Sequence, residues 1–166
     1  MPTAVMTYHV VMAFHIMAVF LAYGLPAAYP LLIPYVRRRH PEAMPGVHDV
    51  QYRLNVLLTG PGTVLIFVLG AYMASKHHLW GEHWVQVPLA ILVLIGAVGG
   101  AIIVPATRRM SELASADVAR AGGAGGGGIT WSAAYRQVYR RYMAAEITLG
   151  VAVLVAIFFM AAKPFA

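Results

Sequence analysis

The sequence contains no cysteine and few charged residues. The absence of cysteine excludes disulfide bonds, thiolate metal sites, iron–sulfur clusters and a thiol nucleophile. Charged residues make up only 11% of the 166 residues, against roughly 25% in soluble domains. So few charges cannot cover a surface that faces water, which excludes a soluble enzyme, a disordered tail and a secreted disulfide scaffold.

Hydrophobic residues make up 60% of the chain and form long runs. A helix needs about 20 mostly apolar residues to cross a bilayer. Four stretches meet this length, at residues 5–36, 54–74, 84–106 and 143–162. The sequence therefore predicts an all-α membrane protein, a single four-transmembrane-helix bundle in the lipid bilayer. Pro26, Pro30 and Pro34 recur near the end of the first stretch and predict a kink or an early helix end near Pro26.

The basic residues are distributed unevenly around these stretches. Ten of the 12 Lys and Arg residues lie beside the first and third connections, and only Lys76 and Lys163 lie on the other side. Because basic residues are retained in the cytoplasm, we expect both termini to be extracytoplasmic. No recognition motif accompanies these residues, so we expect no nucleic-acid partner.

The third connection contains a glycine-rich segment at residues 121–128. Glycine runs have no side chains to pack, so this segment is expected to be a flexible cytoplasmic linker. After it, residues 131–141 interleave aromatic residues with Arg136 and Arg140, which is typical of an interfacial helix that leads into the last span.

Polar residues at membrane depth are costly and mark candidate functional sites. His15 lies about ten residues into the first stretch, near the middle of the bilayer. It is either hydrogen-bonded to a neighbouring helix or acts as a ligand or proton-handling group. Arg53 and Glu146 begin the second and fourth spans, where they either pair and fix the helix register or face a bound ligand.

A second polar group is expected at the opposite, outer side of the membrane. It consists of four histidines, His9, His77, His78 and His83. Imidazoles bind zinc, copper and haem iron, and the thioethers of Met6 and Met73 nearby favour Cu(I). The alternative is a set of solvated loop residues. His40 and His48, on the cytoplasmic side, are expected to be ordinary loop residues.

Two glycine motifs lie within the spans. The segment Thr59-Gly60-Pro61-Gly62 places a helix breaker between glycines in the second span, which indicates either a close helix crossing or a contact between a flat ligand and bare backbone. In the third span, Gly96 and Gly100 form a G-x-x-x-G motif that favours close helix packing.

These features together resemble a known family of membrane proteins. The relevant segments, in order, are Ala13-Phe14-His15-Ile16, Arg53-Leu54, Thr59-Gly60-Pro61-Gly62, Glu146 and Lys163-Pro164-Phe165. They resemble the four-span bacterial proteins around the HemJ-type protoporphyrinogen oxidases. In size and ending, the chain is closer to a sister group of integral membrane proteins of unknown function. The CopD copper-resistance membrane domains are more distant relatives.

The resemblance implies a bacterial cytoplasmic (inner) membrane protein with a haem or porphyrin site. His15 corresponds to the first-span histidine that is understood to bind haem in HemJ-type enzymes, and Arg53, Thr59 and Glu146 would flank the site. Those enzymes also require a third-span lysine. The position in this chain that corresponds to that lysine is about Pro88, and residues 84–106 contain no lysine. Porphyrin oxidation is therefore one possible activity of a haem site rather than an expected one.

The leading interpretation is a four-helix protein that binds haem b through His15 and serves in electron transfer, haem handling or porphyrin oxidation. Two alternatives remain open. One is a copper transport or accessory protein that uses the outer histidines and methionines. The other is a small subunit without a cofactor, packed in a homo-oligomer or a larger membrane complex.

Overall fold

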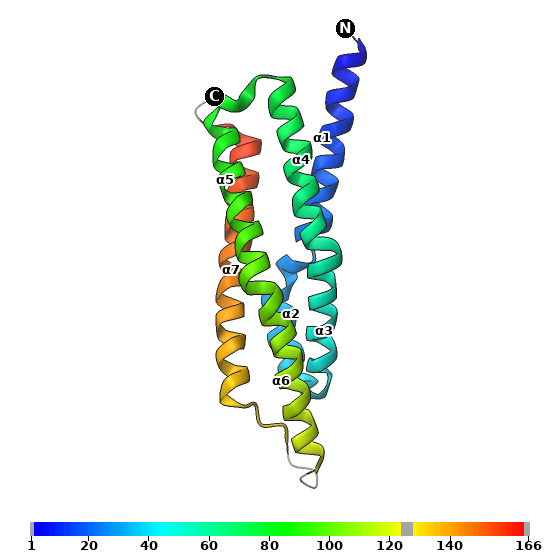
Figure 1. Ribbon diagram of the computed structural model, residues 1–166, viewed down its shortest axis with the longest axis vertical. Helices are drawn as coiled ribbons and strands as arrows, with labels where there is room; N and C mark the ends of the chain where they lie inside the picture. Colours follow the sequence, from blue (N-terminus) through cyan, green and yellow to red (C-terminus); the bar gives the residue numbers. More distant parts are fainter. Residues whose placement is uncertain (1, 124–127, 165–166) are drawn as a thin grey trace.

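The computed structural model describes residues 2–123 and 128–164, and every regular element in this part of the chain is helical (Figure 1). The first half comprises α1 (Pro2–Tyr23), η1 (Pro26–Ala28), α2 (Tyr29–Arg39), η2 (Pro41–Ala43), α3 (Met44–Leu54), η3 (Asn55–Thr59) and α4 (Gly60–Lys76). The second half comprises η4 (Leu79–Gly81), α5 (His83–Val98), η5 (Gly99–Ile103), α6 (Val104–Gly123) and α7 (Ala133–Ala162).

These elements join into four passages that are long and apolar enough to cross a membrane. They span Met6–Arg39, Pro41–Lys76, His83–Gly122 and Ala133–Ala162. The longest has 40 residues, about 60 Å of helix, whereas the hydrocarbon core of a bilayer is about 30 Å thick. The predicted all-α class with four membrane-spanning helices is confirmed, and the helices continue well beyond the predicted apolar stretches.

The long passages change their helical geometry close to some of their prolines. The first passage is interrupted, since α1 ends at Tyr23 and a 3-10 turn begins at Pro26 before α2. In the second and third passages, the π turns η3 and η5 end two residues before Pro61 and Pro105. Proline has no N–H and its ring crowds the preceding turn, so a wider π turn accommodates it without ending the passage.

The two ends of the bundle pack differently. At the end away from the termini, α3 packs along α6, and α6 and α2 pack against α7. Six side chains there are almost wholly buried: Tyr29, Ile33, Met44, Met110, Tyr135 and Tyr142. At the end that holds both termini, the helices form two pairs, α1 with α4 and α5 with α7, whereas α1 and α7 hardly touch.

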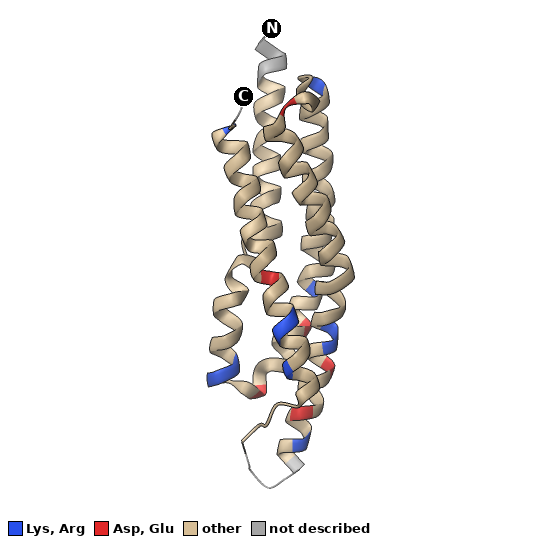
Figure 2. Cartoon of the chain, turned by 90° about the vertical axis from the view of Figure 1, so that its left-hand side faces the viewer, with Lys and Arg blue, Asp and Glu red and all other residues tan. Residues whose placement is uncertain are grey.

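Most Lys and Arg residues lie at the end away from the termini, which we call the Arg-rich end (Figure 2). There α6 continues to Gly123, so the helix includes the first residues of the predicted linker, and residues 124–127 lie outside the described residues. The Ser132 side chain accepts a hydrogen bond from Tyr135 N and caps α7. The predicted interfacial helix is thus the first part of α7, continuous with the last span.

Candidate functional site

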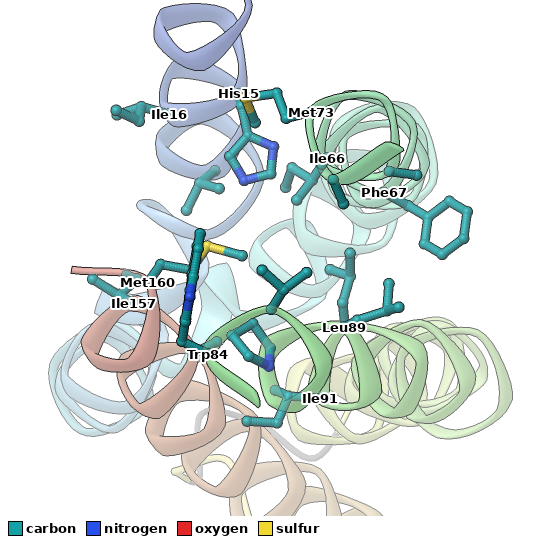
Figure 3. Close-up of a pocket in the computed structure, with 18 of the residues that line it drawn as sticks. His15, Ile16, Ile66, Phe67, Met73, Trp84, Leu89, Ile91, Ile157 and Met160 are labelled. Carbon is teal, nitrogen blue, oxygen red and sulfur yellow. The ribbon is translucent and has the colours of Figure 1, made fainter. Parts of the chain in front are cut away.

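A cavity of about 480 Å³ lies between α1, α4, α5 and α7, towards the end of the bundle that holds the termini. Its walls are almost entirely apolar, and its size falls in the range of small-molecule sites, about 300–1,000 Å³. Figure 3 shows His15 reaching into this space from α1, with Trp84 of α5 and Met160 of α7 on the other side. The cavity is therefore the candidate ligand site.

His15 contributes a polar side chain to the apolar lining of the cavity. Its side chain is 6% exposed, and its Nδ1 atom is buried without a hydrogen-bond partner. The imidazole lies against Gly70 of α4, where an added Cβ would stand 3.3 Å from His15 Cε1. A glycine at this position thus gives the ring the room it occupies, and the imidazole forms part of the cavity wall.

Lys163 stands at the rim of the same cavity, directly after α7. Its Nζ lies 4.7 Å from the centre of the Trp84 ring, a cation–π contact, and its φ of 45° places it in the left-handed region that often ends a helix. From the sequence, Lys163 is one of the two basic residues on the side of the termini and part of the terminal Lys163-Pro164-Phe165 segment. Its distance along the chain from His15 and Trp84 hid the fact that all three line one cavity.

Arg53 lies elsewhere, on the exposed surface of α3. Its Nε donates a hydrogen bond to Asp49 Oδ2 at 2.8 Å, and 68% of its side chain is exposed. The suggested pairing with Glu146 is therefore wrong. An acidic residue one helical turn away offers a closer partner that keeps both charges in water.

Thr59 belongs to a helix crossing and does not line the cavity. Its hydroxyl donates to the Ala22 carbonyl oxygen of α1 at 3.2 Å, and Tyr23 Oη lies 2.7 Å from Thr63 Oγ1. A Cβ added to Gly62 would stand 2.8 Å from Ala22 Cβ, closer than carbon atoms pack. The glycine-proline segment thus serves the close crossing of α1 and α4. In the G-x-x-x-G motif, Gly96 lies near Thr63, whereas Gly100 faces open space.

Glu146 is buried in the half of the bundle towards the Arg-rich end, beside Tyr29 and Tyr142. A chain of hydrogen bonds leads to this position. Gln51 Nε2 donates to Tyr142 Oη at 2.9 Å, and Gln51 Oε1 lies 2.8 Å from His48 Nδ1. His48 Nε2 lies 2.9 Å from Tyr135 Oη.

The partners of His48 determine its tautomer. The Gln51 carbonyl oxygen can only accept, so His48 Nδ1 carries the proton and donates to it. Neutral His48 therefore accepts the Tyr135 hydroxyl proton at Nε2. Burial lowers the pKa of His48 to about 4, the bond to Gln51 opposes this change, and the positive charge of Arg37 reinforces it.

The expectation that His48 is an ordinary loop residue is wrong, since it is fully buried in α3 and satisfied at both ring nitrogens. The spacing of His48 and Gln51, three residues apart, could have indicated one helix face. The tyrosines that form hydrogen bonds with these two residues lie more than 80 residues further along the chain, so no local sequence pattern indicates these contacts.

The four outer histidines do not form a cluster. His9, His77, His78 and His83 are all exposed, and His77 packs its ring against Tyr8 with the ring centres 4.7 Å apart. No group of three or more His, Cys, Asp or Glu side chains that could hold a metal ion occurs within residues 2–123 and 128–164. The geometry of this part of the chain offers no support for the copper alternative.

The comparisons with known proteins give no assignment. No family model matches the chain, and no match was found among curated proteins or solved structures. The fold and the cavity thus define a class, a multi-pass helical membrane protein with a histidine-bearing apolar cavity between its helix pairs.

Proposed function

We propose that this protein binds a flat tetrapyrrole, haem b or a related porphyrin, in the cavity between its helix pairs, with His15 as the iron ligand. One observation carries the proposal. His15, whose Nδ1 atom is buried without a hydrogen-bond partner, lines an apolar cavity of about 480 Å³. Leaving a buried polar atom unpaired costs about 1–3 kcal/mol, so an imidazole that protein groups leave unsatisfied beside a cavity favours a role as a ligand.

The residues around the cavity fit such a group. A neutral imidazole is a common axial ligand of haem iron, and apolar walls suit the faces of a porphyrin. The thioethers of Met73 and Met160 also line the cavity and would offer further soft ligands to the iron. Arg53, Thr59 and Glu146 lie outside this lining, so His15 alone among the expected binding residues is proposed to hold the group.

Haem bound at such a position would supply one-electron chemistry. The chain's own contribution is to exclude water, to hold the imidazole in one orientation against Gly70, and to set the polarity around the site. Electron transfer, haem handling and porphyrin oxidation all need these conditions. Because His15 lines this site, we also propose that the chain is related to the HemJ-type proteins.

We also propose that the Arg-rich end lies in the cytoplasm of a bacterial cell and that both termini lie outside. Basic residues are retained on the cytoplasmic side of the inner membrane. Ten of the 12 Lys and Arg residues belong to the connections at that end. With this orientation, the cavity lies in the outer half of the membrane, next to both termini.

The decisive experiment is the absorption spectrum of the protein purified in mild detergent after expression with ample haem. We expect a Soret band that sharpens with dithionite, is absent in His15→Ala and persists in the matched control His83→Ala. The His15→Gly variant should regain the band when imidazole is added, because free imidazole replaces the missing ligand. A colourless wild-type protein that also fails to take up added haem would refute the proposal and favour a subunit without a cofactor.

A further inference from the structure

The wall of the cavity is incomplete between α1 and α7. Ile16 of α1 and Ile157 of α7 both line the cavity, yet they are 59% and 46% exposed on the outer surface. Figure 3 places both residues on the same side of the cavity. The two helices hardly touch, so they do not pack against each other along this side of the cavity. In a bilayer this surface faces lipid, so the cavity opens sideways into the membrane.

A lysine side chain stands at the rim of the cavity. Lys163 is the only one of the Lys, Arg, Asp and Glu residues that lines this cavity in the described part of the chain. No salt bridge to an acidic side chain is found for it within residues 2–123 and 128–164. The rim around it is aromatic, with Tyr8, Trp80 and Trp84. Aromatic rings and lysine are typical of the interface between lipid and water.

We propose that the ligand enters from the bilayer between α1 and α7 and that Lys163 binds a carboxylate of the ligand at the rim. The ligand class is then a flat amphiphile dissolved in the membrane, with an apolar body near His15 and a carboxylate at the end of the bundle that holds the termini. This inference rests on the proposed function, to which it adds an entry route and a charged contact.

The carboxylate contact is tested with two porphyrins, protoporphyrin IX and its dimethyl ester, which share the ring but differ in charge. Binding is followed by quenching of tryptophan fluorescence. A charge-assisted contact at an exposed rim is expected to favour the free acid about tenfold. Lys163→Gln should abolish this preference by weakening binding of the acid about tenfold and leaving the ester unchanged. Lys76→Gln, which removes a lysine near the same end but outside the cavity, should change neither affinity.

The entry route is tested on a folded protein, because the wild-type chain has no cysteine. Ile157→Cys and the control Leu154→Cys each provide one thiol for a bulky maleimide after purification. Leu154 is 67% exposed on the same helix and does not line the cavity. After transfer to lipid vesicles loaded with porphyrin, we expect at least tenfold slower association with labelled Ile157→Cys and an unchanged rate with labelled Leu154→Cys.

The outcomes separate the two proposals. If wild type binds both porphyrins equally and Lys163→Gln has no effect, the carboxylate contact is refuted while the cavity proposal stands. If the label at position 157 leaves association unchanged, the sideways entry route is refuted. If the wild-type protein binds neither porphyrin, the proposed function itself is overturned, and this inference with it.

Discussion

The hydrogen-bonded histidine at the Arg-rich end makes the stability of this protein depend on pH in a defined direction. His48 lies in α3, in the polar first part of the Pro41–Lys76 passage and before the apolar stretch at residues 54–74 that is expected to cross the hydrocarbon core, and it donates to Gln51 while accepting from Tyr135. Burial lowers its pKa from the ordinary value of 6.5 to about 4. Between these two values the unfolded chain binds a proton that the folded protein does not. Acid should therefore destabilise the fold across this window.

The magnitude follows from the same two values. A difference of about 2.5 between the folded and unfolded pKa values corresponds to about 3 kcal/mol. The free energy of unfolding should be unaffected by His48 above about pH 6.5, should fall as the pH drops, and should have lost the whole contribution near pH 4. For a chain of this size, 3 kcal/mol corresponds to roughly 6–12 °C in Tm.

The assay is thermal unfolding in mild detergent at a series of pH values between 4 and 7.5, with His48→Gln as the matched variant. Glutamine is polar and does not titrate, so the variant removes this one group and retains the other ionisable residues. We expect the wild-type Tm to fall more steeply than that of the variant below about pH 6.5. His48→Asn provides a second variant of this kind. Parallel curves for wild type and both variants would refute the reasoning.

Three further predictions concern the helix crossing, the cavity and the surface. Gly62→Ala places a methyl group 2.8 Å from Ala22 Cβ and should cost about 1–3 kcal/mol in denaturant unfolding, whereas an unchanged midpoint would contradict the close crossing. Gly70→Leu should displace the imidazole of His15 and reduce porphyrin affinity at least tenfold, with helical content by circular dichroism unchanged. Arg53→Gln should leave porphyrin affinity and the unfolding midpoint unchanged, because its ion pair is exposed to solvent; a loss of porphyrin binding would show that Arg53 belongs to the site.

Composition and hydrophobic runs were sufficient to predict four membrane-spanning helices, because a bilayer leaves few alternatives to a helix. They did not reveal that polar residues 44–53 and 107–122 continue as α3 and α6. In that part of the fold, buried polar groups lie beside the apolar core. Thr107 and Asp117 are almost fully buried, and Asp117 Oδ2 accepts a hydrogen bond from Ser132 N at 2.9 Å.

The site was predicted only in part, because the sequence does not show how the helices are arranged around it. His15 could be singled out from the sequence as the one histidine expected at mid-membrane depth. The cavity beside it depends on how α1 and α7 diverge, which no local pattern encodes. The packing of α5 against α7 brings Trp84 and Lys163 together at the rim, although they belong to different helical passages. Arg53 and Glu146, which the resemblance to the HemJ-type proteins placed beside His15, lie in the other half of the bundle.

The two buried histidines differ in how their ring nitrogens are satisfied, and this difference bears on the proposed ligand site. His48 uses both ring nitrogens in hydrogen bonds to protein groups, so it holds helices together and has nothing left to offer a ligand. His15 keeps a buried nitrogen unpaired beside a cavity that could take a ligand. The Tyr29 hydroxyl and the Asn55 amide are also buried without partners, but neither lines that cavity. This difference supports His15, and not His48, as the residue for which we propose an external ligand.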